Sequence, residues 1–149
     1  PAGAFAGAGV LAALPAGRCG LAETARVVRY LALESAGQCG PCFNGLPRMA
    51  TALAVLARAD VPAGRARPGM ARRWPDLAAV QADLVRWAGL VEGRGACHHP
   101  DGTARLVRSA LRVFAAEAGR HCRGQCTGTG ARPFLPLPPE PAIDAAGWR

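Results

Sequence analysis

The sequence predicts an all-α fold, a four-helix bundle, and three observations support this prediction. Apolar residues recur at spacings of three and four in four separate segments, which is the periodicity of one face of an α-helix. Half of the residues are hydrophobic but only 5% are aromatic, and much of the apolar content is alanine, which packs small and favours helix over a large β-sandwich. The length of 149 residues fits one domain with a real core, since domains usually contain roughly 100–200 residues.

The chain ahead of the first helix can supply only a short β-strand remnant. Residues 1–20 are rich in glycine and alanine, and the apolar run at 10–14 ends at Pro15 and Gly17. No basic stretch precedes the apolar residues at the N-terminus, so they are a poor signal peptide. The chain also starts at Pro1 and not at a methionine, so we expect an excised domain or a fragment of a longer protein.

The first helix is predicted at about residues 22–35, because its apolar residues share one stripe and its charged residues lie off it. A loop follows over residues 36–45, which contain three glycines and Pro41. Pro47 is suited to the first turn of a second helix. The buried side of that helix would consist of Met49, Ala50, Leu53, Ala54, Leu56 and Ala57.

The third helix is predicted after a basic connection. Residues 60–73 carry two prolines, two glycines and four arginines, a composition typical of a mobile segment. Pro75 and Asp76 are good first-turn residues, and a narrow apolar seam follows them. The seam would consist of Leu77, Val80, Leu84, Trp87 and Val91.

The fourth helix is predicted after a loop at residues 96–100, with Asp101 or Thr103 as its cap, and it extends to His121. Its buried face would consist of Val107, Ala110, Leu111, Phe114 and Ala118. The chain then turns to glycine, threonine and proline. Residues 122–149 are therefore predicted to be a flexible, disordered, Pro-rich C-terminal tail.

Charge and hydropathy exclude several classes of protein. The net charge is +8, and all 18 cationic side chains are arginines, since the sequence contains no lysine. This uniformity indicates a compositional bias, and we predict no nucleic-acid partner. Charged residues, glycine or proline interrupt every apolar run before the roughly 18 residues that a membrane span needs. We predict no membrane insertion and a cytoplasmic location.

The six cysteines favour metal or redox chemistry over a disulfide framework, because no secretory signal is apparent. The sharpest local motif is Cys39-Gly-Pro-Cys42, followed by Pro47, which is typical of a thioredoxin-like dithiol site. That fold needs a strand just before the motif, whereas a helix with polar residues at its end is predicted there. A dithiol protein is therefore the weakest of three interpretations.

The second interpretation is a zinc-stabilised structural module. Two thiolates that are two residues apart on a tight turn can point at one metal. Cys39 and Cys42 could combine with Cys97 and with His98 or His99 as a Cys3His set.

The third interpretation rests on a longer stretch. Residues 34–42, ESAGQCGPC, followed by Gly45, resemble the E-S-C-G-x-C-x-P-C-x-x-G signature of the NADH-binding flavoprotein subunit of respiratory complex I. Related NAD-linked hydrogenases and formate dehydrogenases share this signature. In that family the motif opens a C-terminal helical domain that holds a [4Fe-4S] cluster, and a fourth cysteine precedes the last helix. Residues 106–121 resemble that closing helix, and residues 3–20 resemble the end of the family's β-grasp domain.

The resemblance implies three segments: the end of a β-grasp domain at 1–20, an iron-sulfur domain at 21–121 and the tail. It implies cluster ligands at Cys39, Cys42 and Cys97, with Ala36 in place of the first family cysteine. It implies electron transfer from a flavin to a further redox centre. FMN and NAD would bind only to a domain absent from this chain, and the partners would be that flavin- and NADH-binding domain or subunit and other redox subunits.

The fourth ligand is a separate question. The nearest donors to Cys97 along the chain are His98, His99 and Asp101, and we predict His98 as the additional metal ligand. A helix from Thr103 to His121 would be about 28 Å long at about 1.5 Å per residue, which places Cys122 at the opposite end from Cys97. Cys19 is expected at that opposite end too. Cys122 and Cys126 are expected to be free thiols with no nearby ligand partner.

Overall fold

The structure, a computed structural model, describes residues 11–57, 76–123, 125–126, 128 and 133–138. Within these residues the chain forms five α-helices, one π-helical turn and no strand. They are α1 (Gly20–Leu33), η1 (Pro41–Gly45), α2 (Leu46–Ala57), α3 (Leu77–Val91), α4 (His99–Val113) and α5 (Ala115–Cys122). The predicted helical fold is confirmed for the described part. No strand occurs at described residues 11–14, and the rest of the predicted strand remnant lies outside the described residues.

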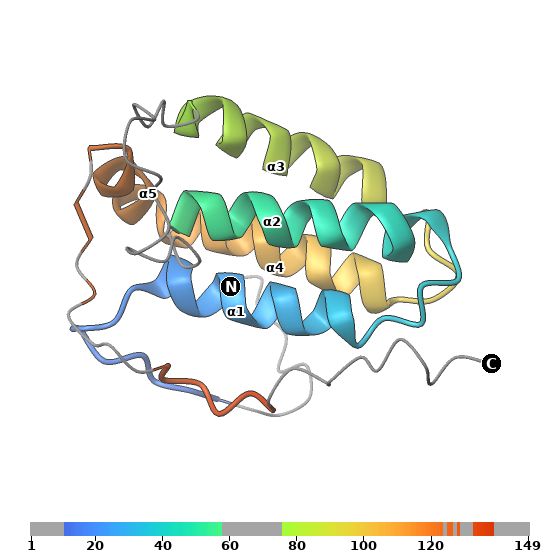
Figure 1. Cartoon of the computed structure of the whole chain (residues 1–149), viewed down its shortest axis with the longest axis horizontal. Helices are drawn as coiled ribbons and strands as arrows, with labels where there is room; N and C mark the ends of the chain where they lie inside the picture. The colour runs from blue at the N-terminus through green and yellow to red at the C-terminus, as the bar shows by residue number, and fades with distance from the viewer. Residues whose placement is uncertain (1–10, 58–75, 124, 127, 129–132, 139–149) are drawn as a thin grey trace, which may run out of the picture.

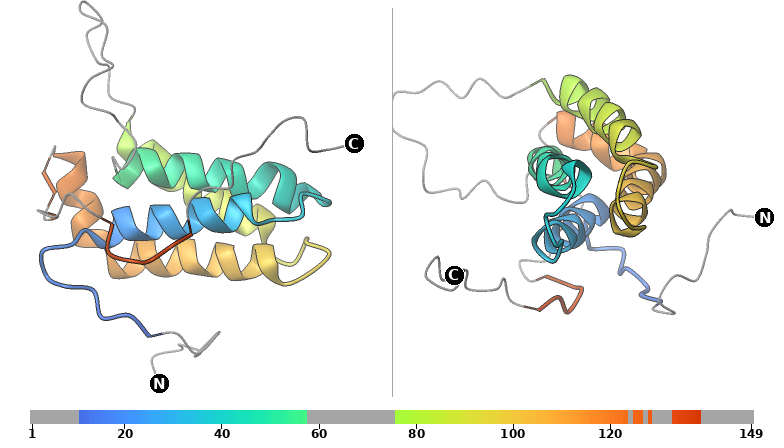
Figure 2. Two further views of the ribbon diagram at one scale, coloured as in Figure 1. Left: turned by 60° about the horizontal axis from the view of Figure 1, so that its bottom comes forward. Right: turned by 90° about the vertical axis from the view of Figure 1, so that its right-hand side faces the viewer.

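The four longer helices lie side by side, and the shorter α5 crosses one end of them (Figures 1 and 2). Helices α1 and α3 each pack against both α2 and α4. The α1–α2 loop and the α3–α4 loop meet at one end of the domain, which we name the loop end (Figure 1). The start of α1 lies beside α5 at the other end, which we name the α5 end.

Helix α1 begins two residues earlier than predicted because Cys19 caps it. The Cys19 Sγ accepts a hydrogen bond from the Ala22 N–H at 3.4 Å, which satisfies one of the donors left open at a helix N-terminus. Thr24 Oγ1 donates to the Gly20 carbonyl at 2.7 Å. The first turn is thereby fixed at the point where the chain enters the domain.

Helix α3 begins at Leu77, so Asp76 precedes the first turn in which it was predicted, and Pro75 lies outside the described residues. Asp76 is its N-cap, and the Asp76 carboxylate accepts hydrogen bonds from the N–H groups of Ala78 and Ala79. Helix α4 instead begins ahead of the predicted caps, at His99, with Pro100 in its first turn. Asp101 accepts from the Gly93 N–H and Thr103 donates to the His99 carbonyl, so neither caps the helix.

The predicted fourth helix is in fact two helices, which makes the expected number of four wrong. The chain leaves helical geometry at Phe114, between α4 and α5. The Phe114 ring packs against Gly20, where an added Cβ would lie only 2.2 Å from the ring atom Cε1. The break therefore lets an aromatic ring close the α5 end over the start of α1.

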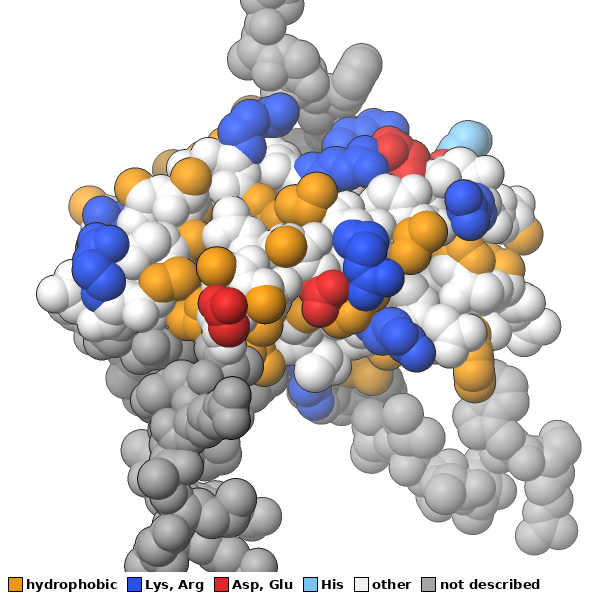
Figure 3. Space-filling model, turned by 90° about the horizontal axis from the view of Figure 1, so that it is seen from above, with side chains coloured by type: hydrophobic (Ala, Val, Ile, Leu, Met, Phe, Trp, Pro, Cys, Tyr) orange, Lys and Arg blue, Asp and Glu red, His pale blue; other side chains and the backbone are white. Residues whose placement is uncertain are grey.

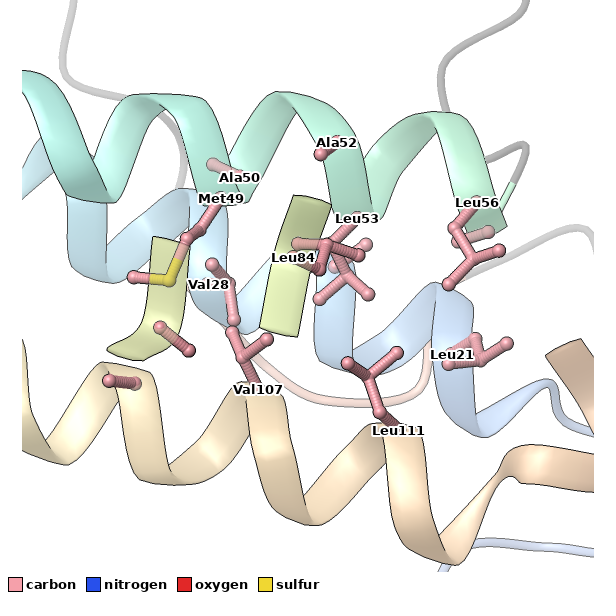
Figure 4. Close-up of a cluster of buried hydrophobic side chains, with 14 of the residues drawn as sticks. Leu21, Val28, Met49, Ala50, Ala52, Leu53, Leu56, Leu84, Val107 and Leu111 are labelled. Carbon is pink, nitrogen blue, oxygen red and sulfur yellow. The ribbon is translucent and has the colours of Figure 1, made fainter. Parts of the chain in front are cut away.

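The core lies between α1, α2, α3 and α4 (Figure 4). Its largest fully buried apolar side chains are Leu21, Val28, Leu46, Met49, Leu53, Leu56, Leu84 and Val107. Each such side chain contributes about 1.5–3 kcal/mol on burial. Because apolar packing joins all four long helices, the loop end and the α5 end are held on one frame.

Part of the C-terminal segment packs on α1, contrary to the prediction of a disordered tail. The N–H groups of Phe134 and Leu135 donate to the Glu23 carboxylate at 2.9 and 3.1 Å. Arg26 donates to the Leu135 carbonyl at 3.1 Å and also pairs with Glu23 at 2.7 Å. Most of the rest of the predicted tail lies outside the described residues.

The surface on the α3 side carries its arginines among acidic, neutral and apolar side chains (Figure 3). Val85 and Leu90 of α3 are about half exposed, at 53% and 47%. The predicted basic connection at 60–73 lies outside the described residues. In the described part, no helix has the length and hydropathy of a membrane span.

Candidate metal centre

The Cys39-Gly-Pro-Cys42 motif lies at the loop end, where the chain passes from α1 to α2. The Cys39 carbonyl accepts the Phe43 N–H at 2.9 Å, and the wider turn of η1 then continues into α2. Short π-helical turns of this kind occur frequently at functional sites. This local geometry buries Cys42 and leaves Cys39 half-buried.

The motif is fixed to α3 through a glycine. A Cβ added at Gly45 would lie 2.4 Å from Cγ2 of Val91, so only glycine lets η1 approach the last residue of α3 this closely. The α3–α4 loop starts directly after Val91 and contains Cys97. The contact therefore brings both cysteine-bearing loops to one end of the domain.

The three predicted cysteine ligands are brought together there. Backbone hydrogen bonds from Ala96 and Cys42 lower the pKa of the Cys39 thiol. Burial raises the pKa of Cys42, and the neighbouring thiols of Cys39 and Cys97 raise it further. Cys97 itself is exposed. Cys39 thus touches the backbone of the second loop, and Cys42 lies within electrostatic reach of Cys97.

The position of the missing family cysteine lies beside these thiols. Ala36 is exposed and directly follows Ser35, whose hydroxyl donates to the Ala32 carbonyl at 2.9 Å and lies close enough to Cys42 to lower its pKa. An alanine side chain has no donor atom for a metal. The described residues of the loop end therefore offer three thiols and no fourth.

The two histidines next to Cys97 differ in their surroundings. His99 Nε2 is 2.8 Å from the Leu31 carbonyl, to which it donates, so this nitrogen is occupied. The His98 ring is fully exposed, with Nδ1 3.7 Å from Asp101 Oδ2. The role of His98 as a ligand stays a prediction.

A second group of metal-binding side chains lies at the α5 end. Cys19, Glu117, His121 and Cys126 each offer one ligand atom, and these atoms all lie within 4.8 Å of one another. Burial is the main cause that raises the pKa of Cys19 to about 11. The expectation that Cys126 has no nearby ligand partner is wrong, whereas Cys19 does lie at the α5 end as predicted.

The sequence held one signal for this second group. Glu117 and His121 are four residues apart on one helix, which places them on the same face. Cys19 and Cys126 have no mutual spacing that predicts contact, because nearly the whole domain separates them along the chain. Only the fold brings them to this pair.

The loop-end donors suit an iron-sulfur cluster better than a single ion. Thiolates are the usual ligands of such clusters, and the ligands of a cluster bind different iron atoms. In the described part of the chain, the sulfur atoms of Cys39, Cys42 and Cys97 do not all lie within 4.8 Å of one another, so they are more widely spaced than the ligands of one ion. The donor chemistry of the three thiols thus fits an iron-sulfur cluster.

Comparison with known proteins agrees with this chemistry. A family model for the iron-sulfur binding region of NADH-ubiquinone oxidoreductase-F matches residues 22–121. Searches of curated proteins and of solved structures found no significant match. The matched range begins in α1 and ends in α5, so it includes all or nearly all of every helix described. The chain therefore belongs to the family of NADH-ubiquinone oxidoreductase-F iron-sulfur binding regions.

Proposed function

We propose that the helical domain holds an iron-sulfur cluster through Cys39, Cys42 and Cys97 and passes electrons from a flavin on a neighbouring domain to a further redox centre. The observation that carries this proposal is the meeting of the three thiols at the loop end of a domain in this family. His98 is the proposed additional ligand, because its ring is exposed beside Cys97.

The cluster would supply one-electron redox chemistry, and the chain's own residues would fix its place and potential. The η1 turn and the Gly45–Val91 contact hold the two loops together. Hydrogen bonds from Ala96 and Cys42 favour the thiolate form of Cys39. Hydrogen bonds to the sulfurs and the degree of solvent exposure are the means by which a protein tunes such a potential.

The exposed loop end also suits electron exchange with partners. Phe43 lies next to Cys42 and is 71% exposed, and an exposed aromatic side chain is typical of protein interfaces. We propose the flavin- and NADH-binding domain and other redox subunits as the partners at this end. FMN and NAD would bind to that flavin- and NADH-binding domain.

The test is the iron, sulfide and zinc content of anaerobically purified protein. We expect iron with acid-labile sulfide in the wild type, and the loss of both in Cys97→Ser. The matched control is Cys122→Ser, since Cys122 is also exposed but lies in α5. If the wild type instead contains zinc and no sulfide, and Cys97→Ser loses that zinc, the proposal is wrong and the domain is a zinc-stabilised structural module.

A dithiol function has one observation in its favour, because the pKa of Cys39 is lowered and that of Cys42 is raised. The fold argues against it: α1 precedes the motif, and the described residues contain no strand. We expect no insulin-reducing activity above background with a thiol reductant. Activity that disappears in Cys39→Ser would contradict the cluster assignment.

A further inference from the structure

We propose that Cys19, Glu117, His121 and Cys126 form a second metal site, specific for a single zinc ion, at the α5 end. The four residues combine two thiols, an imidazole and a carboxylate, which are the ligand types that zinc takes in proteins. Ca²⁺ and Mg²⁺ prefer sets made of oxygen alone. This site is independent of the proposed cluster at the loop end.

Two distances from His121 Nε2 are close to those of tetrahedral coordination. Cys19 Sγ lies 3.5 Å from His121 Nε2, and His121 Nε2 lies 3.1 Å from Glu117 Oε1. Zinc–ligand bonds of about 2.3 Å to sulfur and about 2.0–2.2 Å to nitrogen and oxygen would separate tetrahedral S and N by about 3.5 Å and N and O by about 3.4 Å. A zinc ion therefore fits among these atoms with small shifts.

The His121 ring is oriented as a metal ligand. Its Nδ1 lies 2.9 Å from the Leu56 carbonyl, which can only accept, so Nδ1 carries a proton and donates. With an ion bound, the lone pair of Nε2 would be free to coordinate it between the thiol of Cys19 and the carboxylate of Glu117. Metal-binding histidines regularly donate their other ring nitrogen to a backbone carbonyl in this way.

The burial of the group also favours a cation. His121 is fully buried, and Glu117 and Cys19 are only 4% and 6% exposed. Burial of a carboxylate is costly unless it is paired or binds a metal. Arg120 pairs with Glu117 Oε2 at 2.5 Å, while the other oxygen, Oε1, is the one that faces His121. The alternative occupant of that position is a proton on His121, which would make a buried ion pair.

The C-terminal segment completes the site on its open side. Cys126 is exposed, which leaves a path for an ion to enter. The Gly128 N–H donates to Cys126 Sγ at 3.3 Å, and a Cβ at Gly128 would lie 3.0 Å from Cys19 Cβ. The close fit brings the segment after α5 onto the cap of α1. A bound ion would thus join the start of α1 to the segment after α5.

The experiment is a titration of the reduced, chelator-treated full chain with Co²⁺, followed by competition with Zn²⁺. We expect one tightly bound ion with the visible bands of tetrahedral cobalt and a thiolate-to-cobalt charge-transfer band, displaced by zinc. Cys126→Ser should weaken binding by at least about tenfold. Because Cys126 is exposed and lies outside the helices, the fold should survive, which circular dichroism can verify.

Two matched controls separate this site from the loop end. Cys122→Ser removes an exposed thiol from the same helix as His121, and Cys97→Ser removes one from the loop end. Both should retain the tight cobalt signal. A signal lost with Cys97→Ser but kept in Cys126→Ser would overturn the proposal.

Two other outcomes would also overturn it. The first is the absence of tight cobalt and zinc binding by the wild type. The group at the α5 end would then be explained by an ion pair between His121 and Glu117 instead of a metal site. A Cys19–Cys126 disulfide, detected by mass spectrometry of protein purified without a reductant and restored after reduction and re-exposure to air, would assign the two thiols to each other instead.

Discussion

The two ends of the domain both gather cysteines, but most of these cysteines lie in loops at one end, and most of the donors are buried at the other. At the loop end, Cys39 is half-buried and Cys97 exposed, and both lie in loops. At the α5 end, Cys19 and His121 are buried and belong to the cap and body of helices. Cys42 is the buried exception at the loop end, and Cys126 is the exposed exception at the α5 end. Partly exposed loop donors leave room for a multi-iron cluster and a redox partner. Three buried donors close together suit one small ion with a structural role.

The largest expected effect is a reciprocal loss of metal at the two ends. Cys42→Ser should abolish iron and sulfide and leave the zinc at the α5 end in place, since the sites share no ligand. Cys126→Ser should do the reverse. Metal and sulfide analysis of both variants checks this, and the loss of both metals in either variant would show that the ends are coupled.

The next effect concerns the missing cysteine at position 36. Ala36→Cys should slow the loss of the cluster chromophore in air several-fold. The new thiolate follows Ser35, which lies close to Cys42, and it would give the cluster a fourth cysteine ligand. Absorbance decay after exposure to air measures the rate. Ala79→Cys is the control, as Ala79 is exposed on α3. An unchanged decay rate would indicate that another residue already fills the fourth position.

At each end of the domain a glycine lies too close to a neighbouring side chain to carry a Cβ, and replacing that glycine with alanine tests the contact. Gly45→Ala should destabilise the fold by about 1–3 kcal/mol, because the new Cβ overlaps Val91. Gly20→Ala should be similarly harmful through Phe114. Gly102→Ala meets nothing within 4 Å and should stabilise α4 by about 0.5–1 kcal/mol. Urea unfolding checks the order, and equal stabilities for all three variants would contradict it.

The smallest effect is expected at the contact between α1 and residues 133–138. Although desolvation raises it, the pKa of Glu23 is lowered overall, by the N–H groups of Phe134 and Leu135 and by Arg26. Glu23→Gln should cost about 1 kcal/mol at neutral pH.

The sign of the pH dependence follows from this lowered pKa. The contribution of Glu23 is fully present above the pKa of an unfolded glutamate, about 4.3, and is lost as the pH falls through the lower pKa of the folded state. The stability difference between wild type and Glu23→Gln should therefore shrink below about pH 4. Urea unfolding at several pH values tests this, and a difference that grows in acid would contradict it.

Local pattern determined much of the fold and of the loop-end site. The spacing of apolar residues predicted the helical fold, and Asp76 was recognised as a residue of a helix start, where its oxygen accepts from N–H groups two and three residues later. Cys39 and Cys42 were identified for the same reason, since a site within four residues is a local property. The resemblance of residues 34–45 then added Cys97, and the family match covers that region.

Tertiary structure alone decided the break at Phe114, the packing of residues 133–138 and the group at the α5 end. Each depends on contacts between residues far apart in the sequence: Phe114 with Gly20, Leu135 with Glu23, and Cys126 with Cys19. Helical periodicity reports which face of a segment is apolar, but not which distant side chain will lie against it. The packing of the helices around one core decides which side chains meet, and it brings Cys19 and Cys126 to the Glu117–His121 pair to form a candidate metal site.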